Sequence, residues 1–287
     1  MIRAIGIGDN VCDKYRHLNQ MFPGGQALNF AVYCRLKGNE SAYIGVFGND
    51  AVSEHIQKVL KEIDVDFSKC RYYEGENGYA VVDLEDGDRV FVTSNKGGVL
   101  FTHPLEFSEK DLEYIASYDI IHTSNNSFID RQLGKLSILP NRLSYDFSGT
   151  WIDEERTKNT CRFLDFGFAS CSELTDMQVY QQATKMYSWG CKIVVVTMGP
   201  RGVVAFNGQN YYQHQPKLME PVDTLGAGDS LVSGFLMHFV ENTKDEMPIV
   251  GSSEYDELLI NSLKAGAELS AETCMIKGAF GHGTEMV

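Results

Sequence analysis

Apolar residues along this chain alternate between short unbroken runs and segments with a helical period. Runs of this kind are typical of strands buried on both faces of a parallel sheet. They occur at 2–7, 41–47, 120–122, 142–147, 163–170 and 191–197. The segments between them repeat apolar residues every three or four positions and predict helices over 26–37, 52–63, 108 onward, 131–137, 176–189, 231–240 and 254–275.

This alternation of strands and helices predicts an α/β fold in three layers, with a mostly parallel central sheet covered by helices on both faces. The chain shows no internal repeat, low-complexity segment or linker, so residues 1–287 are expected to form a single domain.

One region departs from the rhythm. Residues 79–84 and 89–92 alternate apolar with polar positions, and the turn Glu85-Asp86-Gly87-Asp88 joins them, which predicts an antiparallel hairpin. Without further information, such a hairpin is expected as an edge addition to the main sheet.

Near the C-terminal end, the stretch 222–230 carries three nearly side-chain-free residues, Gly226, Ala227 and Gly228, directly before a buried helix. The backbone N–H groups at a helix start lack partners, and the helix dipole favours anions there. Asp229 follows at once. A carboxylate beside such an anion site is either a helix cap or a base.

The N-terminal third contains further candidate ligand-binding residues. The first strand ends at Gly8-Asp9, the usual place for a ligand in an open parallel sheet. The glycine pair Gly24-Gly25 opens the next helix and Asn29 lies one turn inside it. Asp9 and Asp13 are expected to face the ligand, with a surface turn as the alternative for each. A dinucleotide fingerprint starting at Gly6 is disfavoured because its third glycine would be Val11.

The string Asp-Thr-x-Gly-Ala-Gly-Asp at 223–229 resembles the C-terminal signature of the ribokinase-like (PfkB) carbohydrate kinases. In that family, the last aspartate takes the proton from the sugar hydroxyl that attacks ATP. The resemblance implies that Asp229 is the catalytic base, that Gly226, Ala227 and Gly228 form the anion hole, and that Thr224 lies beside the nucleotide.

The N-terminal signature of the family, Gly-Gly-x-x-x-Asn followed by an apolar helix, resembles residues 24–29. The resemblance therefore implies that Asp9, Asp13, Gly24, Gly25 and Asn29 bind the sugar. Many members have a lysine third in this motif, where the present chain has a glutamine at position 26. This departure removes one phosphate contact and suggests a substrate without a phosphate nearby.

The strand at 191–197 ends in Thr-x-Gly-x-x-Gly. It resembles the nucleotide loop of the family and implies that Thr197, Gly199 and Gly202 bind the nucleotide. Related kinases place Asn-x-x-Glu where this chain has Ser170 and Glu173. Glu173 and Asp223 are accordingly expected to organise magnesium indirectly, through water. The small-residue face of the last helix, at 265–267, is a candidate flank for the adenine.

The family resemblance covers nearly the whole chain and implies ATP and Mg²⁺ as cofactors, with a monovalent cation as a further option. It also implies a lid built from about 10–22 and 70–98, and lids of this family often pair into homodimers. Residues 8–15, 27–34 and 145–148 look most like fructoselysine and fructosamine 6-kinases. The reaction expected is phosphorylation of a primary hydroxyl, the 6-OH of a fructosamine. An ammonium on such a substrate would need a carboxylate partner, and Glu85, Asp86 and Asp88 are candidates.

Three alternatives stay open at this point. The substrate is ribose, fructose or a sugar acid, or it is a nucleoside, or the protein is a sugar- or nucleotide-binding regulator without turnover. A Walker A loop, a His-Glu-x-x-His pair and a Gly-x-Ser-x-Gly elbow are all absent from the sequence. The triplet Asp165-Phe166-Gly167 lies in an apolar run without the other protein-kinase motifs. His122 ends a strand on the side of the expected site.

The net charge and the cysteines limit the binding partners and the cellular compartment that we expect for this protein. The net charge of −14 argues against nucleic acid or an anionic membrane surface as a main partner. No apolar run is long enough to span a bilayer, and the start of the chain lacks the apolar core of a signal peptide. The seven cysteines are scattered without a Cys-x-x-Cys pair. We expect reduced thiols and a cytoplasmic protein.

Overall fold

A computed structural model describes residues 1–85, 88–216 and 220–287. In these ranges a nine-stranded sheet forms the centre, in the order β13-β12-β11-β10-β9-β8-β1-β4-β5. Neighbours from β11 to β5 pair in parallel, and β12 and β13 add an antiparallel edge. The strands are β1 (Arg3–Gly8), β4 (Glu40–Phe47), β5 (Arg71–Tyr72), β8 (Ile120–Ser124), β9 (Arg142–Asp146), β10 (Phe166–Ser170), β11 (Ile193–Thr197), β12 (Val203–Phe206) and β13 (Tyr211–His214).

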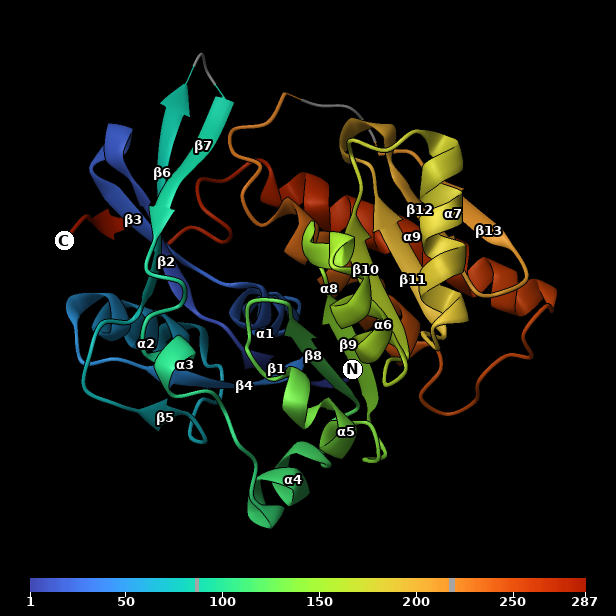
Figure 1. Cartoon of the computed structure of the whole chain (residues 1–287), viewed down its shortest axis with the longest axis horizontal. Coiled ribbons are helices and arrows are strands. Elements are labelled where there is room, and N and C mark those ends of the chain that lie inside the picture. Colours follow the sequence, from blue (N-terminus) through green and yellow to red (C-terminus); the bar gives the residue numbers. More distant parts are fainter. Residues whose placement is uncertain (86–87, 217–219) are drawn as a thin grey trace.

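Helices cover both faces of this sheet (Figure 1). Because side chains alternate across a strand, each strand supplies two cores. Ile193 and Val195 join the core under one helix layer, and Val194 and Val196 join the core under the other. The first layer holds α1 (Gln26–Leu36), α2 (Ala51–Ile63), α8 (Ala227–Glu241) and α9 (Ser253–Thr273). The second holds α3 (Val99–Thr102), α4 (Glu109–Ile115), α5 (Leu133–Leu136), α6 (Glu154–Cys161) and α7 (Asp176–Ser188).

A second sheet of five strands stands at the upper left of the molecule (Figure 1). Its order is β14-β3-β2-β6-β7, and β6 pairs with β7 antiparallel and with β2 in parallel. The predicted hairpin therefore belongs to this second sheet, and the alternative of an edge addition to the main sheet is wrong. Its strands are β2 (Val11–Tyr15), β3 (Gln20–Gly24), β6 (Gly78–Glu85), β7 (Asp88–Ser94) and β14 (Thr284–Glu285).

The predicted three-layer α/β fold is confirmed, with differences at its margins. The hairpin β12–β13 and the helix α6 were not predicted. The sequence of α6, Glu-Glu-Arg-Thr-Lys-Asn-Thr-Cys, shows no apolar period, and its clearest local signal is the cap from the Asp153 carboxylate to the Arg156 N–H, at 3.1 Å. None of the helices in the described ranges is long and apolar enough to cross a membrane.

Candidate active site

A cavity of about 680 Å³ opens where the carboxyl ends of the parallel strands meet the second sheet. Ligands of open α/β sheets bind at this edge. The cavity brings together Asp9, which directly follows β1, and residues from β2, α1, β9, β10, β11 and α8, which are distant in the sequence. Of the predicted site residues, it is lined by Asp9, Asp13, Gly25, Asn29, Thr197, Gly226, Gly228 and Asp229.

Asp229 and Asn29 meet on the floor of the cavity. The Asn29 amide donates a hydrogen bond to the Asp229 carboxylate, with 2.5 Å between Nδ2 and Oδ2. Asn29 lies in the first turn of α1, and Asp229 is the third residue of α8. The two glycine-rich motifs, 200 residues apart, thus start two helices whose first turns face each other.

Burial is the largest cause that raises the pKa of Asp229 to about 7; the negative charge of Asp146 acts in the same direction, and the bond from Asn29 opposes the shift. Asp146 ends β9 and accepts the backbone N–H of Ser148 at 2.7 Å. Burial likewise raises the pKa of Asp146 to about 6, against hydrogen bonds from Ser148 and Gln26. A carboxylate whose pKa lies near neutrality suits a general base.

The start of α8 leaves room for an anion. Gly226 has a positive φ of 75°, and a Cβ there would lie 2.6 Å from the Tyr33 hydroxyl and 2.7 Å from the Ala279 methyl. Gly226 is therefore packed against the protein, whereas a Cβ at Gly228 would meet nothing within 4 Å. Ala227 donates its N–H to Thr224, while those of Gly228 and Asp229 find no protein acceptor among the described residues. The open side of Gly228 is where an anion can reach these donors.

The predicted sugar-binding residues lie beside this floor. Asp13 is 6 % exposed and comes from β2 of the second sheet. A Cβ at Gly24 would lie 2.7 Å from an Asp13 carboxylate oxygen, so glycine is required there for the carboxylate to keep its place. Gly25 begins α1 with φ of 114°, and a Cβ there would lie 2.7 Å from the Asp9 carbonyl oxygen. Asn29 Oδ1 is buried and has no partner in the described structure.

Asp9 lines the cavity but its carboxylate is occupied by the protein. The N–H groups of Gln26 and Ala27, at the start of α1, donate to it at 2.7 and 3.2 Å. The hydroxyls of Ser124 and Ser127 donate to it at 2.8 and 3.0 Å. Asp9 therefore fixes the start of α1 against the end of β8.

Asp223 also holds protein groups together. Its carboxylate accepts the Tyr15 hydroxyl at 2.8 Å and the backbone N–H groups of Leu225 and Gly278 at 3.0 and 2.9 Å. These contacts shape the loop that enters α8 and connect it to β2. Asp223, Gly24, Ala227 and Thr224 lie next to the cavity and do not line it.

The nucleotide-side residues extend from the ends of β10 and β11. Thr197 lines the cavity at the end of β11, and Ser170 lines it at the end of β10. Gly199 and Gly202 bound a short turn with φ of 59° and 102°, and a Cβ at Gly202 would lie 2.3 Å from the His214 carbonyl oxygen. Glu173 is exposed in the turn after β10. Thr197 faces the cavity, and Gly199, Gly202 and Glu173 stand outside its lining.

Two weaker candidates lie outside the cavity lining. His122 is 1 % exposed, packs against Phe30 and contacts the Ser144 hydroxyl at 3.0 Å; burial lowers its pKa to about 3. It belongs to the core. The small-residue face of α9 packs against α8, since a Cβ at Gly266 would lie 2.6 Å from the Leu231 carbonyl oxygen.

The cavity also contains residues to which sequence reasoning gave no role. Gln26 accepts a bond from Asn126 at 3.1 Å and hydrogen-bonds Asp146. The sequence motif alone did not indicate these partners of Gln26. Lys96, Phe101 and Phe128 line the opposite wall. They come from loops without a motif, so only the folded chain brings them together. Three acidic residues were candidate partners for a substrate ammonium. Of these, Asp86 and the side chains of Glu85 and Asp88 lie outside the described residues.

Comparison with known proteins gives one consistent class. The model of the pfkB family of carbohydrate kinases matches residues 1–136 and 165–278. The chain is 38% identical over 285 residues to fructosamine kinase FrlD of Bacillus subtilis (strain 168), covering 98% of this chain and 94% of that protein. It is 32% identical over 230 residues to fructoselysine 6-kinase of Escherichia coli (strain K12), covering 80% and 86%.

The fold agrees. The structure of Arabidopsis thaliana ribokinase complexed with ribose and ATP superposes with a TM-score of 0.79 at 20% sequence identity, covering 98% of this chain and 95% of that one. A ribokinase-like fold thus carries the site described above. The chain belongs to the pfkB family of carbohydrate kinases. The expectation of an ATP-dependent carbohydrate kinase is confirmed.

Proposed function

We propose that this protein transfers the γ-phosphoryl group of ATP to the 6-hydroxyl of a fructosamine such as fructoselysine, with Asp229 as general base. The relatives that are fructosamine and fructoselysine kinases support this substrate class. The substrate hydroxyl lies against Asp229, which accepts its proton as the oxygen attacks the phosphorus.

The hydrogen bond between Asn29 and Asp229 is the observation that carries the proposal. It fixes the Asp229 carboxylate on the cavity floor through Oδ2. The other carboxylate oxygen, Asp229 Oδ1, is proposed to receive the proton. The pKa of about 7 leaves the carboxylate largely ionised above neutral pH and basic enough to accept a proton.

The start of α8 supplies the charge stabilisation. The N–H groups of Gly228 and Asp229 point into the anion position at the positive end of the helix dipole, and Ala227 contributes to the same turn. Fixed donors at the site where charge develops supply much of the catalysis in phosphoryl transfer.

The nucleotide is proposed to lie along the ends of β10 and β11, against Thr197 and the turn from Gly199 to Gly202, with Thr224 opposite. Among the described residues, no group of three or more acidic, histidine or cysteine side chains is arranged to hold a metal ion. Glu173 is exposed in the turn after β10, and Asp223 lies in the loop that enters α8; both are proposed to meet, through water, a magnesium ion that arrives on the ATP phosphates. When bound, such an ion neutralises phosphate charge.

The sugar is proposed to bind Asp13, Asn29 and the Gly24-Gly25 backbone, and the unpartnered Asn29 Oδ1 is a ready acceptor for a hydroxyl. Asp9 then acts by holding the start of α1. The second sheet, with segments 10–22 and 70–98, serves as the lid that keeps water from the phosphoryl group within the single domain.

The experiment is ATP consumption with magnesium across fructosamines, fructose, ribose, sugar acids and nucleosides, for the wild type and Asp229→Asn. Turnover of fructosamines, with phosphate found on O6 by NMR and loss in the variant, supports the proposal. Turnover confined to another sugar or to a nucleoside overturns the substrate class. Ligand binding without turnover on any substrate would indicate a regulator.

Three further properties complete the proposal: a cytoplasmic location, a homodimer through the lid and activation by a monovalent cation. All seven cysteines are free, as in a reducing compartment. The dimer is supported by the edge strand β7, where Val92 is 45% exposed. Light scattering of the wild type and Val92→Lys tests the dimer, and replacing potassium with tetramethylammonium tests the cation.

A further inference from the structure

Lys96 is the one cationic side chain among the described residues that line the cavity. Four aspartates share that lining: Asp9, Asp13, Asp146 and Asp229. Lys96 is exposed, and no carboxylate pairs with it in the described structure. The hydroxyl groups of a neutral sugar do not require such a cation, whereas a negatively charged group on a ligand can pair with it.

Two aromatic rings stand next to this lysine. Phe101 and Phe128 line the cavity with 54% and 37% of their surfaces exposed, and their ring centroids are 5.3 Å apart, edge to face. A Cβ at Gly97 would lie 3.2 Å from the Phe128 ring, which places that ring directly beside the Lys96–Gly97 turn. Exposed apolar rings in a cavity are suited to a hydrocarbon segment.

The two loops that carry these residues are fixed by hydrogen bonds. The Asn95 side chain accepts the Tyr79 N–H at 2.9 Å and donates to the Asn77 carbonyl at 2.7 Å. The Asn95 carbonyl accepts the Gly98 N–H at 3.1 Å, which closes the turn around Lys96. The lysine backbone therefore has a defined place at the cavity wall.

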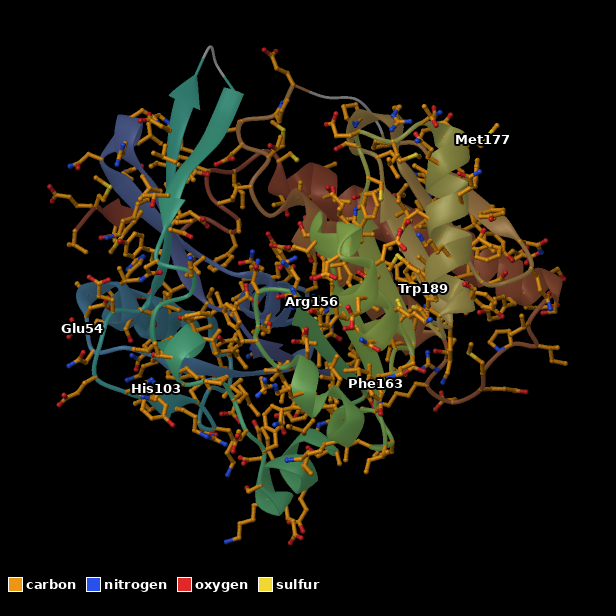
Figure 2. The ribbon with its side chains drawn as sticks, viewed as in Figure 1. Glu54, His103, Arg156, Phe163, Met177 and Trp189 are labelled. Atoms are coloured by element: carbon orange, nitrogen blue, oxygen red, sulfur yellow. The ribbon has the colours of Figure 1, made fainter. Side chains whose placement is uncertain are left out.

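Arg156, labelled near the middle of Figure 2, holds the loop of Phe128. Its guanidinium donates to the Asn125 carbonyl at 2.8 Å, to the Asp130 carboxylate at 2.6 Å and to the Tyr145 hydroxyl at 2.9 Å. Both ends of the segment 125–130 are thus tied to one side chain. A backbone fixed in this way lowers the ordering cost of binding a ligand.

We infer that Lys96, Phe101 and Phe128 form the subsite for the amino-acid part of a fructosamine, with Lys96 binding its carboxylate and the two rings packing on its hydrocarbon chain. This inference rests on the proposed function, because it assigns one end of that substrate. Lys96 then determines specificity for carboxylate-bearing conjugates and takes no part in the phosphoryl transfer.

The test compares fructoselysine with fructosylcadaverine, its analogue without the carboxylate, on the wild type and Lys96→Gln. One charge-assisted hydrogen bond predicts that the wild type prefers fructoselysine by about tenfold or more in kcat/KM, through KM. Lys96→Gln is expected to lose most of this preference and to keep its turnover of fructosylcadaverine. Lys110→Gln, an exposed lysine on α4 outside the cavity lining, is the matched control and is expected to behave as the wild type.

Phe101→Ser supplies a second, independent arm. Its KM is expected to rise for both conjugates, because both carry the hydrocarbon chain. An equal loss on both conjugates in Lys96→Gln, or a wild type indifferent to the carboxylate, overturns the subsite while the proposed function stands. A wild type that phosphorylates no fructosamine overturns both. A preference transferred to a phosphate-bearing sugar would show that Lys96 binds phosphate, and would also overturn the assignment.

Discussion

The hydroxyl of Tyr15 donates to the carboxylate of Asp223 at 2.8 Å, and this bond joins the second sheet to the loop that begins α8. Asp223 also accepts the Leu225 N–H at 3.0 Å, so the bond acts on the geometry of the anion site. The second sheet and the loop that enters α8 are therefore coupled through Asp223.

Tyr15→Phe is expected to lower kcat by about three- to tenfold, because small displacements at a reacting centre are costly. The loss of one hydrogen bond to a charged group should also lower the free energy of unfolding by about 1–2 kcal/mol. Steady-state kinetics and thermal unfolding measure both effects. Tyr212→Phe is the matched control, since Tyr212 makes a similar bond to Asp256 at the distant β13 edge. A larger kinetic effect in the control would contradict the coupling.

Asp229→Asn is expected to lower kcat by about a hundredfold or more, because the proposed base is lost. The asparagine oxygen still accepts the Asn29 bond, so the affinity for sugar should stay close to that of the wild type. Rapid-quench kinetics measure the loss of turnover, and calorimetry measures the affinity for the sugar. A variant that keeps more than a tenth of the activity would exclude Asp229 as the base.

The raised pKa of Asp229 makes a prediction for stability. The unfolded chain releases the proton near its ordinary pKa, and the folded chain holds it to about 7. Folding thus favours the protonated form, and this contribution to stability is present at low pH and is lost as the pH rises towards 7. Asp229→Asn should therefore melt higher than the wild type at pH 8, with a smaller difference at pH 5. A difference that grows towards low pH would contradict the sign.

The proposal that Asp229 is the base also predicts the pH dependence of activity. The base must be ionised, so kcat/KM should rise with pH through about 7 and then level off. Asp146→Asn removes a neighbouring charge that raises the Asp229 pKa, and should move this limb to lower pH. Asp245→Asn, an exposed acid on the loop after α8, removes the same charge elsewhere and should leave the profile in place. Profiles of kcat/KM from pH 5 to 9 for the wild type and both variants test this prediction. A profile that shifts equally in both variants would contradict it.

Gly24→Ala tests the sugar side. The added methyl would lie 2.7 Å from the Asp13 carboxylate, so Asp13 must move away from its position. We expect the KM for the sugar to rise about tenfold or more, while the KM for ATP changes little. Gly149→Ala is the control, because a Cβ there meets nothing within 4 Å and φ is −88°. Equal effects on both KM values would indicate a general disturbance.

The elements that could be predicted from the sequence are those with a strong local pattern of apolar or capping residues. The apolar runs of β1 and β11 and the capping box of Ser108 and Asp111 were predicted correctly because pattern and structure share one cause, burial or capping. The helix α6 carries no such pattern, so its burial depends on tertiary contacts that a sequence window does not contain.

The candidate site divides in the same way. Asp229, Asn29 and Gly226 lie in motifs whose spacing encodes a helix start, so the sequence alone placed them. Asp146 and Lys96 acquire their roles from neighbours far along the chain. The environment of Asp146 is set by Asp229 and Gln26, from two other elements. The spacing of residues within one segment cannot predict contacts of this kind between distant segments.

The buried carboxylate of Asp9 holds one side of the cavity in place, and the opposite wall does not depend on it. Its four bonds hold α1, and with it Asn29, independently of any ligand. The wall of Lys96, Phe101 and Phe128 stands on other loops. Substitutions in that wall are therefore expected to change which ligand group fits there without moving Asn29.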